Sequence, residues 1–280
     1  MFIHITSMNP IVTKADILYV IPFRGKNQYR KKNLRLVIQW ITSAKKYLKT
    51  NYDMTLDIMI VEQDREPYDQ IPKEELSHLF LANQLMFNKG WSFNVAVKQA
   101  PNYHYYGFAD ADIVIPNVAV FCDQLVEHCV IKPKQAFRPF TNRLDTSLAN
   151  CSLINSFDEL LNSFPSIECN LPKHGGLSFA SNMIFLSKAT YEQIGGWDEI
   201  FRGWGRYDDF ITHKLSLICQ LPVVYSSISA VHLWHPVTLD FSLNPENVDL
   251  YNKLTKYNKN DLLKLIDCNR QTIGISEKLT

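Results

Sequence analysis

The alternation of apolar and polar positions in the first half of the chain predicts strands separated by helices. Short apolar runs rich in β-branched and aromatic residues indicate three buried strands, at residues 17–23, 55–62 and 105–115. Stretches that look helical lie between them, at residues 27–48, 74–89 and 91–99. This order of elements predicts an α/β fold, in which helices cover both faces of a mostly parallel sheet.

No internal repeat, low-complexity tract or linker divides the 280 residues. We therefore expect a single domain, 1–280, that ends in a helical tail within residues 241–280. In open sheets with parallel strands, ligands bind outside the carboxyl ends of the strands. Three segments with polar side chains fall at those ends, at residues 22–24, 62–64 and 110–112. The sequence thus predicts a binding site at this edge of the sheet.

Composition and charge exclude several classes of protein. With 46% hydrophobic and 20% charged residues, the chain has a globular rather than a disordered composition. Lys and Arg total 29 against 28 Asp and Glu, which argues against a general nucleic-acid binder. No secretory signal or bilayer-length apolar segment is visible, and the six cysteines include no CxxC pair. We expect a reduced, cytoplasmic protein.

Nine basic residues and no acidic residue lie between residues 17 and 52. Arg24 and Lys26 fall in the turn before the first helix, whose N-terminus also offers backbone N–H groups to an anion. This arrangement favours a diphosphate or another anionic ligand. For Lys31, Lys32 and the lysines of residues 45–49, a solvated helix face is the simpler interpretation. Docking of the cluster on an anionic membrane surface is a further alternative.

Asp110 and Asp112 end the third predicted strand. Alternation along an extended chain would point both carboxylates to the same face. Two carboxylates held together repel one another unless a cation lies near. A divalent ion that bridges to phosphate oxygens would resolve the repulsion, since Mg²⁺ and Mn²⁺ prefer oxygen ligands.

His232 and His235 form a second candidate metal element. Two imidazoles three residues apart can converge on one ion from a turn or an irregular segment. Their nitrogen donors favour Mn²⁺ or a similar transition ion over Ca²⁺. We expect at least one of the two to be a ligand.

Residues 203–209, with the sequence GWGRYDD, form the third candidate element. Glycines on both sides of Trp204 give a backbone that can move and a ring that can cover a ligand. Asp208 and Asp209 then open a predicted helix at residues 210–219, where carboxylates suit the N-terminus. N-capping alone explains Asp209, whereas Asp208 is a candidate general base for an attacking hydroxyl.

Six motifs along the chain occur in the same order as in a known family. They are IPFRGKNQYR, FNKGWSFNVA, FADADIVIP, FLSKATYEQIGGWDE, GWGRYDDF and HLWH. On these motifs the chain resembles the β-1,4-galactosyltransferase family and its bacterial, capsule-polysaccharide-synthesising relatives. The resemblance implies the GT-A glycosyltransferase fold, with a nucleotide-binding half at about 15–116 and an acceptor-binding, catalytic half at about 117–240. It also implies a UDP-sugar donor, Mn²⁺ or Mg²⁺ as cofactor, and inversion at the anomeric carbon.

The resemblance also implies roles for individual residues. Donor contacts are expected from Pro22, Phe23, Arg24, Lys26, Phe87, Asn88, Lys89, Asp110 and Trp204. Asp112 and His235 would ligate the metal ion, and His232 stands where family members often have Met. Asp208 falls on the expected catalytic base. Acceptor contacts are expected from Trp204, Arg206, Tyr207 and Asp209.

Departures from the family pattern limit what is implied about the acceptor. Arg206 and Tyr207 stand where the family has Gly and the Glu that positions its acceptor sugar. We expect an inverting, metal-dependent transfer of a hexose, galactose or N-acetylgalactosamine, to a glycan or glycolipid. The protein would be cytoplasmic, either free or peripheral at the inner face of a membrane. Two alternatives stay open: a non-catalytic module that binds nucleotide sugars or glycans, and a metal-dependent phosphohydrolase or nucleotidyltransferase.

Overall fold

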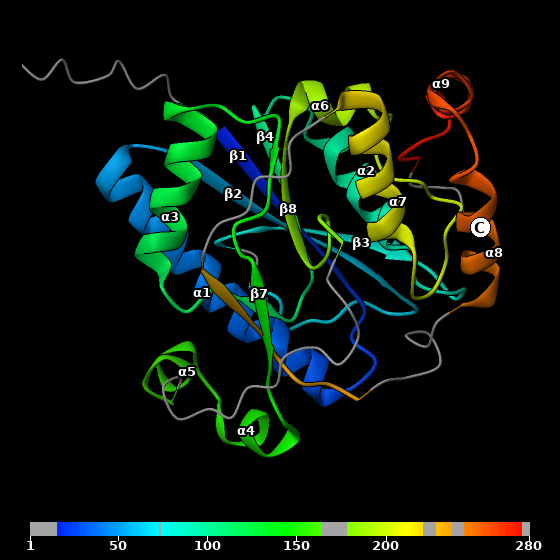
Figure 1. The fold of residues 1–280 in the computed structure, drawn as a ribbon. Helices are drawn as coiled ribbons and strands as arrows, with labels where there is room; N and C mark the ends of the chain where they lie inside the picture. The colour runs from blue at the N-terminus through cyan, green and yellow to red at the C-terminus, as the bar shows by residue number, and fades with distance from the viewer. Residues whose placement is uncertain (1–15, 73, 164–177, 221–227, 237–243, 276–280) are drawn as a thin grey trace, which may run out of the picture.

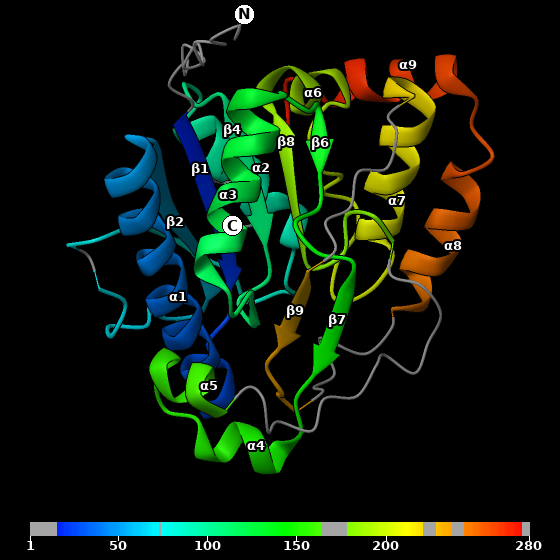
Figure 2. The same cartoon turned by 60° about the vertical axis from the view of Figure 1, so that its left-hand side comes forward.

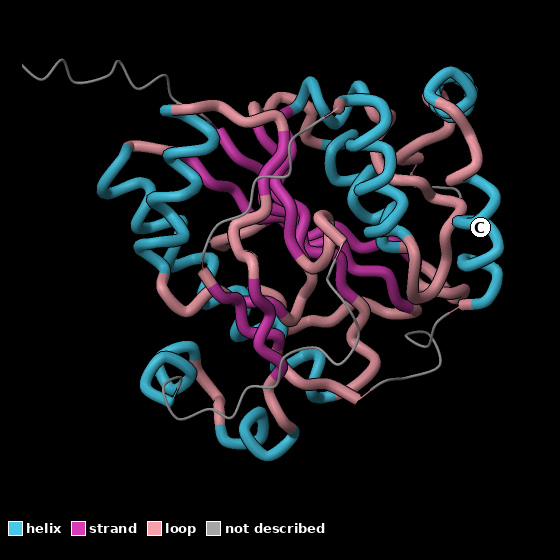
Figure 3. Tube along the Cα trace, viewed as in Figure 1, coloured by secondary structure: helices cyan, strands magenta, loops and turns pink. Residues whose placement is uncertain are grey.

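The structure, a computed structural model, describes residues 16–72, 74–163, 178–220, 228–236 and 244–275. A six-stranded sheet in the order β3-β2-β1-β4-β8-β6 runs through its centre, and helices surround it (Figure 1, Figure 3). Its strands are β1 (Asp16–Phe23), β2 (Thr55–Asp64), β3 (Ser77–Ala82), β4 (Tyr105–Ala109), β6 (Ala136–Phe137) and β8 (Met183–Ser187). A smaller sheet has the order β5-β9-β7 and consists of β5 (Ile113–Val114), β7 (Asn142–Asp145) and β9 (Ser229–His232).

Helices cover both faces of the main sheet. On one face lie α1 (Gln28–Tyr52) and α3 (Val118–Val126), the latter continued by a π-helical turn, Glu127–Ile131. On the other lie α2 (Lys89–Gln99), α6 (Lys188–Gln193) and α7 (Tyr207–Lys214), the last continued by a π-helical turn, Leu215–Cys219. The remaining helices are α4 (Leu148–Leu153), α5 (Phe157–Ser163), α8 (Pro245–Leu254) and α9 (Lys259–Asn269).

The central strand β1 separates two apolar layers by simple alternation. Ile17, Tyr19 and Ile21 belong to the layer under α1 and α3. Leu18 and Val20 point the other way and belong to the layer under α2 and α7. Because both faces are covered, the strand is a continuous apolar run in the sequence, as predicted for a buried strand.

The predicted α/β architecture is confirmed, with a difference in strand direction. β1, β2, β3 and β4 run parallel to one another, whereas β8 runs antiparallel to β4, and β6 antiparallel to β8. The sheet is therefore mixed. Strands from the predicted first half (β1 to β4) and second half (β6 and β8) form one sheet, so both halves share its core.

Two predicted elements differ from the structure. The helix predicted at 74–89 is wrong, because this stretch contains β3, which pairs with β2 in the register Val61↔Leu79. Long-range pairing with the edge of the sheet thus outweighs local helical preference there. The strand predicted at 105–115 is broken by a turn into β4 and β5, which belong to different sheets. Figure 2 shows the smaller sheet beyond the end of β8, with β7 beside β9.

The predicted helical tail consists of two helices that are part of the core. Leu254 of α8 and Leu262 and Ile266 of α9 are buried in the layer that also contains α2. Ile266 lies so close to Gly195 that a Cβ on this glycine would collide with it. Figure 1 and Figure 2 both show α8 next to α7. Among the helices that the structure describes, none combines the length and the apolarity that crossing a membrane requires.

Burial of α9 predicts a loss of stability when its apolar face is truncated. Leu262 is 0% exposed, so Leu262→Ala should lower the free energy of unfolding by about 2–5 kcal/mol through lost burial and a residual cavity. Urea unfolding followed by circular dichroism would measure the change. The matched control is Leu153→Ala, at a leucine that is 77% exposed, where we expect a change within about 0.5 kcal/mol. Equal effects of the two substitutions would show that α9 is not part of the cooperative core.

Candidate functional site

A cavity of about 870 Å³ opens at the carboxyl ends of β1 and β4. Its size lies in the range of small-molecule sites, about 300–1,000 Å³. Most of the predicted site residues line it: Pro22, Phe23, Arg24, Phe87, Lys89, Asp110, Asp112, Trp204, Arg206, Tyr207, Asp208, Asp209, His232 and His235. Lys26 and Asn88 are not among the lining residues. The chain therefore brings the three candidate elements of the sequence to one place.

The sequence suggested that the carboxylates of Asp110 and Asp112 point to the same face of a strand. The structure shows that this prediction is wrong. The two residues lie in the turn between β4 and β5, where the backbone leaves one sheet and enters the other. Asp110 Oδ1 lies 2.7 Å from Lys89 Nζ. Asp112 Oδ2 lies 3.1 Å from His235 Nε2 instead. Each carboxylate thus has its own cation or imidazole partner.

Asp112, His232 and His235 form a candidate metal cluster. Their potential ligand atoms all lie within 4.8 Å of one another. Pairing of β5 with β9 sets Ile113 opposite His232, so the residue before Ile113 lies beside that imidazole. Asn33 on α1 donates hydrogen bonds to the carbonyls of Leu233 (3.2 Å) and Trp234 (3.1 Å), and so holds the loop that carries His235.

The residues of this cluster fit a divalent cation. Asp112 Oδ1 is buried and has no hydrogen-bond partner among the described residues, although His232 Nε2 lies 3.6 Å away. Burial raises the pKa of Asp112, but His232, His235 and Arg30 outweigh it and hold this pKa well below its usual range. One carboxylate and two imidazoles form a donor set that suits Mn²⁺ and similar ions.

Arg30 is a functional candidate that the sequence motifs did not single out. It lies in the first turn of α1, whose N-cap is Asn27. Its guanidinium is 3.3 Å from His235 Nδ1 and 3.8 Å from Asp112 Oδ2, and it lines the cavity. The guanidinium of Arg30 thus places a positive charge beside the candidate metal cluster.

The rest of the basic cluster has other contacts. Lys32 donates to the carbonyl of Cys151, while Lys45 and Lys49 pair with Asp57 and Asp53. These contacts agree with the simpler interpretation of a helix face for those lysines.

Two predicted donor-binding residues also hold the backbone around the cavity. Arg24 is almost fully buried and donates to the carbonyls of Gln63 (2.6 Å), Leu85 (2.8 Å) and Asn83 (3.2 Å). Asn88 caps α2 by accepting from the backbone of Trp91, and it donates to the carbonyl of Glu199. Their predicted contacts with a donor stay predictions. The structure adds that both side chains fix the loops that form the wall.

Lys89 lies between two carboxylates of the cavity wall, Asp110 and Asp208. Its ammonium is 2.7 Å from Asp110 and 3.1 Å from Asp208, and its side chain is 9% exposed. Burial raises the pKa of Asp208 to about 6, with Lys89 acting against this shift and the charge of Asp110 adding to it. Asp208 keeps 23% of its side chain exposed in the cavity wall. It can therefore reach a ligand and exchange a proton near neutral pH.

The loop around Trp204 is held by its backbone and leaves the ring free. Gly203 and Gly205 adopt positive φ angles, and the amide of Gly203 donates to the carbonyl of Phe87. Asn247 on α8 donates to the carbonyl of Gly205 at 3.0 Å. The indole of Trp204 is half exposed at the cavity. A ring on such a loop can cover a bound ligand.

Arg206 and Tyr207, which follow this loop, differ in their surroundings: Arg206 forms an ion pair, and Tyr207 is buried. Arg206 pairs with Asp209 at 3.1 Å and lies over the ring of Tyr251, 5.2 Å from its centroid. Tyr207 is buried, with its ring centroid 6.2 Å from that of Phe201. Tyr207 therefore forms part of the cavity wall.

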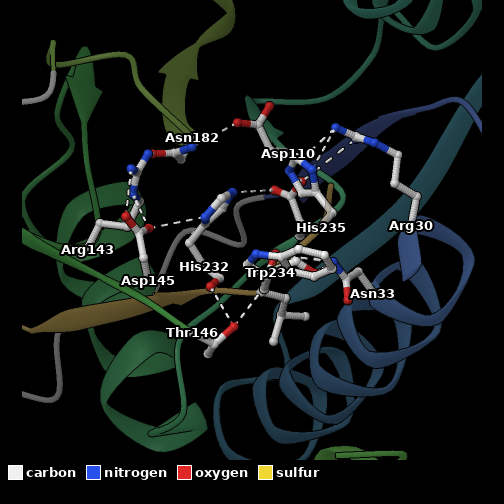
Figure 4. Close-up of polar contacts among 12 residues, drawn as sticks. Arg30, Asn33, Asp110, Arg143, Asp145, Thr146, Asn182, His232, Trp234 and His235 are labelled. Carbon is white, nitrogen blue, oxygen red and sulfur yellow. Dashed lines mark hydrogen bonds and ion pairs between the residues drawn. The ribbon is translucent and has the colours of Figure 1, made fainter. Parts of the chain in front are cut away.

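Two further residues in or near the cavity were missed by sequence reasoning: Arg143 and Asp145. They connect to the predicted site through His232 and Asp110 (Figure 4). Arg143 and Asp145 lie on a four-residue strand, and no motif or spacing in the sequence relates them to a histidine 87 positions beyond Asp145. Only the pairing of β7 with β9 brings them together.

Comparison with known proteins finds similarities at low sequence identity. No protein-family model matches the chain. Human chondroitin sulfate synthase 3 is 22% identical over 245 residues, which cover 85% of this chain and 25% of that protein. The chain thus spans about a quarter of the length of the curated relative it matches.

Solved structures share the fold of this chain. The catalytic domain of Drosophila β1,4-galactosyltransferase 7 gives a TM-score of 0.53 at 13% identity, covering 87% of this chain and 80% of that chain. GalNAc-T7 with UDP, GalNAc and Mn²⁺ gives a TM-score of 0.53 at 11% identity, covering 96% of this chain and 52% of that chain. The predicted GT-A fold is confirmed, as is the predicted likeness to β-1,4-galactosyltransferases at the level of the fold.

The position of Lys89 predicts a stability defect when its charge is removed. Lys89→Met would leave Asp110 and Asp208 without the cation that bridges them. Because both carboxylates are partly exposed, we expect a loss of about 2–3 kcal/mol in the free energy of unfolding at pH 7, below the ~3–5 of a fully buried pair. The control, Lys49→Met, breaks an exposed pair with Asp53 and should cost less than about 1 kcal/mol. Urea unfolding of both variants checks this, and a smaller loss for Lys89→Met than for the control contradicts it.

Proposed function

We propose that this chain transfers a hexose from a UDP-sugar to a hydroxyl of a glycan or glycolipid, with inversion and with Mn²⁺ or Mg²⁺. One observation carries the proposal. A single cavity at the carboxyl ends of the strands joins a three-residue metal cluster, Asp112, His232 and His235, to a carboxylate of raised pKa, Asp208. A metal-assisted group transfer needs both features within reach of one ligand.

The proteins of similar fold support the choice of substrate class. One structure of the Drosophila galactosyltransferase, similar to this chain at a TM-score of 0.52 and 14% identity, contains manganese, UDP-Gal and xylobiose. GalNAc-T7 contains UDP, GalNAc and Mn²⁺. Galactose and N-acetylgalactosamine are accordingly the hexoses that we propose first. Chondroitin sulfate synthase 3, the human relative, is by its name a protein of polysaccharide synthesis, which supports a glycan acceptor.

Donor binding follows from the walls of the cavity. Phe23 ends β1 and Arg24 follows it, while Arg30 adds a second guanidinium beside the metal cluster. Asp112, His235 and His232 would hold the ion, with Pro22, Phe87, Lys89 and Asp110 completing the donor side. An ion held there supplies positive charge that stabilises the departing diphosphate. Arg30 supplies the same sign of charge from the protein itself.

Asp208 acts as the base in this proposal. The acceptor oxygen forms a bond to the anomeric carbon, the bond from that carbon to the diphosphate oxygen breaks, and the hydroxyl proton passes to the carboxylate of Asp208. Lys89 keeps this carboxylate oriented through the 3.1 Å contact. Attack from the face opposite to the leaving UDP inverts the anomeric centre. Trp204 covers the donor and excludes water, which limits hydrolysis.

The acceptor would lie on the side of the cavity formed by the start of α7. We propose that Trp204 and Arg206 contact it, with Tyr207 as a wall and Asp209 held by Arg206. Arg206 adopts a left-handed backbone conformation, φ 70°, at the N-terminus of α7. Its guanidinium lies where the family pattern has Gly and is paired with Asp209.

The substitution Asp208→Asn tests the proposal. With UDP-Gal or UDP-GalNAc, Mn²⁺ and a panel of glycan acceptors that includes xylobiose, the unaltered protein should release UDP, and Asp208→Asn should lower this rate by about 10²–10⁴-fold. The amide keeps the shape of the side chain, so thermal stabilisation by UDP-sugar and Mn²⁺ should persist. Asp267→Asn, an exposed carboxylate on α9, is the matched control and should leave the rate unchanged.

Other outcomes identify the alternative functions. Binding of UDP-sugar and Mn²⁺ without any release of UDP, across a panel of glycan acceptors, would indicate a non-catalytic binding module. Release of phosphate or pyrophosphate would indicate a phosphohydrolase or a nucleotidyltransferase. An Asp208→Asn variant that turns over at the normal rate would refute the assignment of the base.

The raised pKa of Asp208 predicts the pH dependence of transfer. The base must be ionised to accept a proton, so kcat at saturating donor and Mn²⁺ should rise as the pH rises through about 6. Between pH 8 and pH 5 we expect kcat to fall about tenfold, because roughly one carboxyl in ten is still ionised one pH unit below its pKa. Mn²⁺ occupancy, measured at each pH by electron paramagnetic resonance, separates this effect from loss of the ion. A flat profile at full occupancy contradicts the prediction.

A further inference from the structure

The residues that contact His232 from behind the metal cluster lie on β7. β7 pairs with β9 in parallel, and the register sets Asp145 opposite His232. Figure 4 shows the imidazole of His232 between Asp145 on one side and His235 on the other. Asp145 Oδ1 lies 3.1 Å from His232 Nδ1. The far ring nitrogen, Nε2, lies 3.6 Å from Asp112 Oδ1, inside the metal cluster.

The two ring nitrogens of His232 therefore have different neighbours. A neutral imidazole carries one N–H, and the other nitrogen keeps the lone pair that a metal ion needs. A carboxylate beside Nδ1 stabilises the tautomer with the hydrogen on that nitrogen. Nε2 is then left unprotonated and directed at Asp112, where the ion would lie.

Asp145 is itself held in place. Its Oδ1 lies 2.8 Å from Arg143 Nε, and its Oδ2 accepts a hydrogen bond of 3.2 Å from the same guanidinium. The guanidinium of Arg143 thus keeps the Asp145 carboxylate beside Nδ1 of His232.

The backbone of His232 is fixed as well. Its carbonyl accepts from the amide of Thr146 (3.0 Å) and from the hydroxyl of the same residue (3.2 Å). Ring and backbone are therefore both held by β7 and the residue after it. The other end of Arg143 donates to Asn182 (3.2 Å), and Asn182 donates to Asp110 (3.0 Å).

We propose that Asp145, held by Arg143, is a positioning residue that orients His232 and its free Nε2 toward a divalent cation. The inference deepens the proposed function and rests on the metal site of that proposal. Asp145 acts through the histidine and not as a ligand, since it lies at Nδ1 of the ring whereas Asp112 lies at Nε2. Carboxylates in this position raise metal affinity about 10–100-fold in other metal–histidine sites.

The test measures Mn²⁺ binding without turnover. Free Mn²⁺ is titrated by electron paramagnetic resonance against the unaltered protein, Asp145→Ala and Asp145→Asn. Asp145→Ala should raise the dissociation constant about 10–100-fold, and the isosteric Asp145→Asn about tenfold. Asp57→Asn is the matched control, a half-exposed carboxylate that pairs with Lys45 near the start of β2, and its Mn²⁺ binding should be unchanged.

A double-mutant cycle shows whether Asp145 acts through His232. In the His232→Ala background, Asp145→Ala should change the dissociation constant less than about threefold, because the residue it positions is gone. Equal losses in both backgrounds would mean that Asp145 contacts the ion directly or supports the fold, and would overturn the inference. Normal Mn²⁺ binding by both Asp145 variants would also overturn it while leaving the proposed function intact. Absence of Mn²⁺ binding by the unaltered protein would overturn both.

Discussion

The backbone pairing between β5 and β9 is the interaction on which the rest of the site depends. The chain leaves the main sheet after Ala109, turns, and pairs two residues of β5 with the end of β9. The amide of Leu233 then donates to the carbonyl of Asp112 at 2.8 Å. These bonds place a carboxylate beside two histidines that lie 120 or more positions away in the sequence. Without the second, smaller sheet, the carboxylates and the histidines would have no common location.

Opposite charges held at short range give this site its electrostatic character. Three cationic side chains face carboxylates around one cavity: Arg30 beside Asp112, Lys89 between Asp110 and Asp208, and Arg143 beside Asp145. Partly buried charges are costly unless they are paired, so such pairs also order the loops that carry them. Asp208 differs because burial dominates its environment and raises its pKa. One carboxyl is thereby suited to proton transfer.

This chain shares its fold with solved structures, but the side chains at the start of α7 are its own. The GT-A fold is shared with proteins that are 11–14% identical, so the sheet and its helices tolerate almost complete replacement of the sequence. Arg206 and Tyr207 lie at the start of α7, where they shape the side of the cavity away from the metal cluster. Under the proposed function, differences in acceptor are expected there, because side chains at a loop and helix start can change without disturbing the sheet.

Local sequence determined the elements whose pattern is strong and whose partners are near. The apolar run at β1 and the helical spacing of α1 were readable, and ordered motifs identified Asp112, His235 and Asp208 as candidates. Only the tertiary structure decided that β3 is a strand, that Asp110 and Asp112 point to different partners, and that α9 belongs to the core. Arg30, Arg143 and Asp145 became part of the site in the same way. The physical reason is that strand pairing and ion pairing act between positions far apart along the chain, and such contacts leave no periodicity or spacing in the sequence.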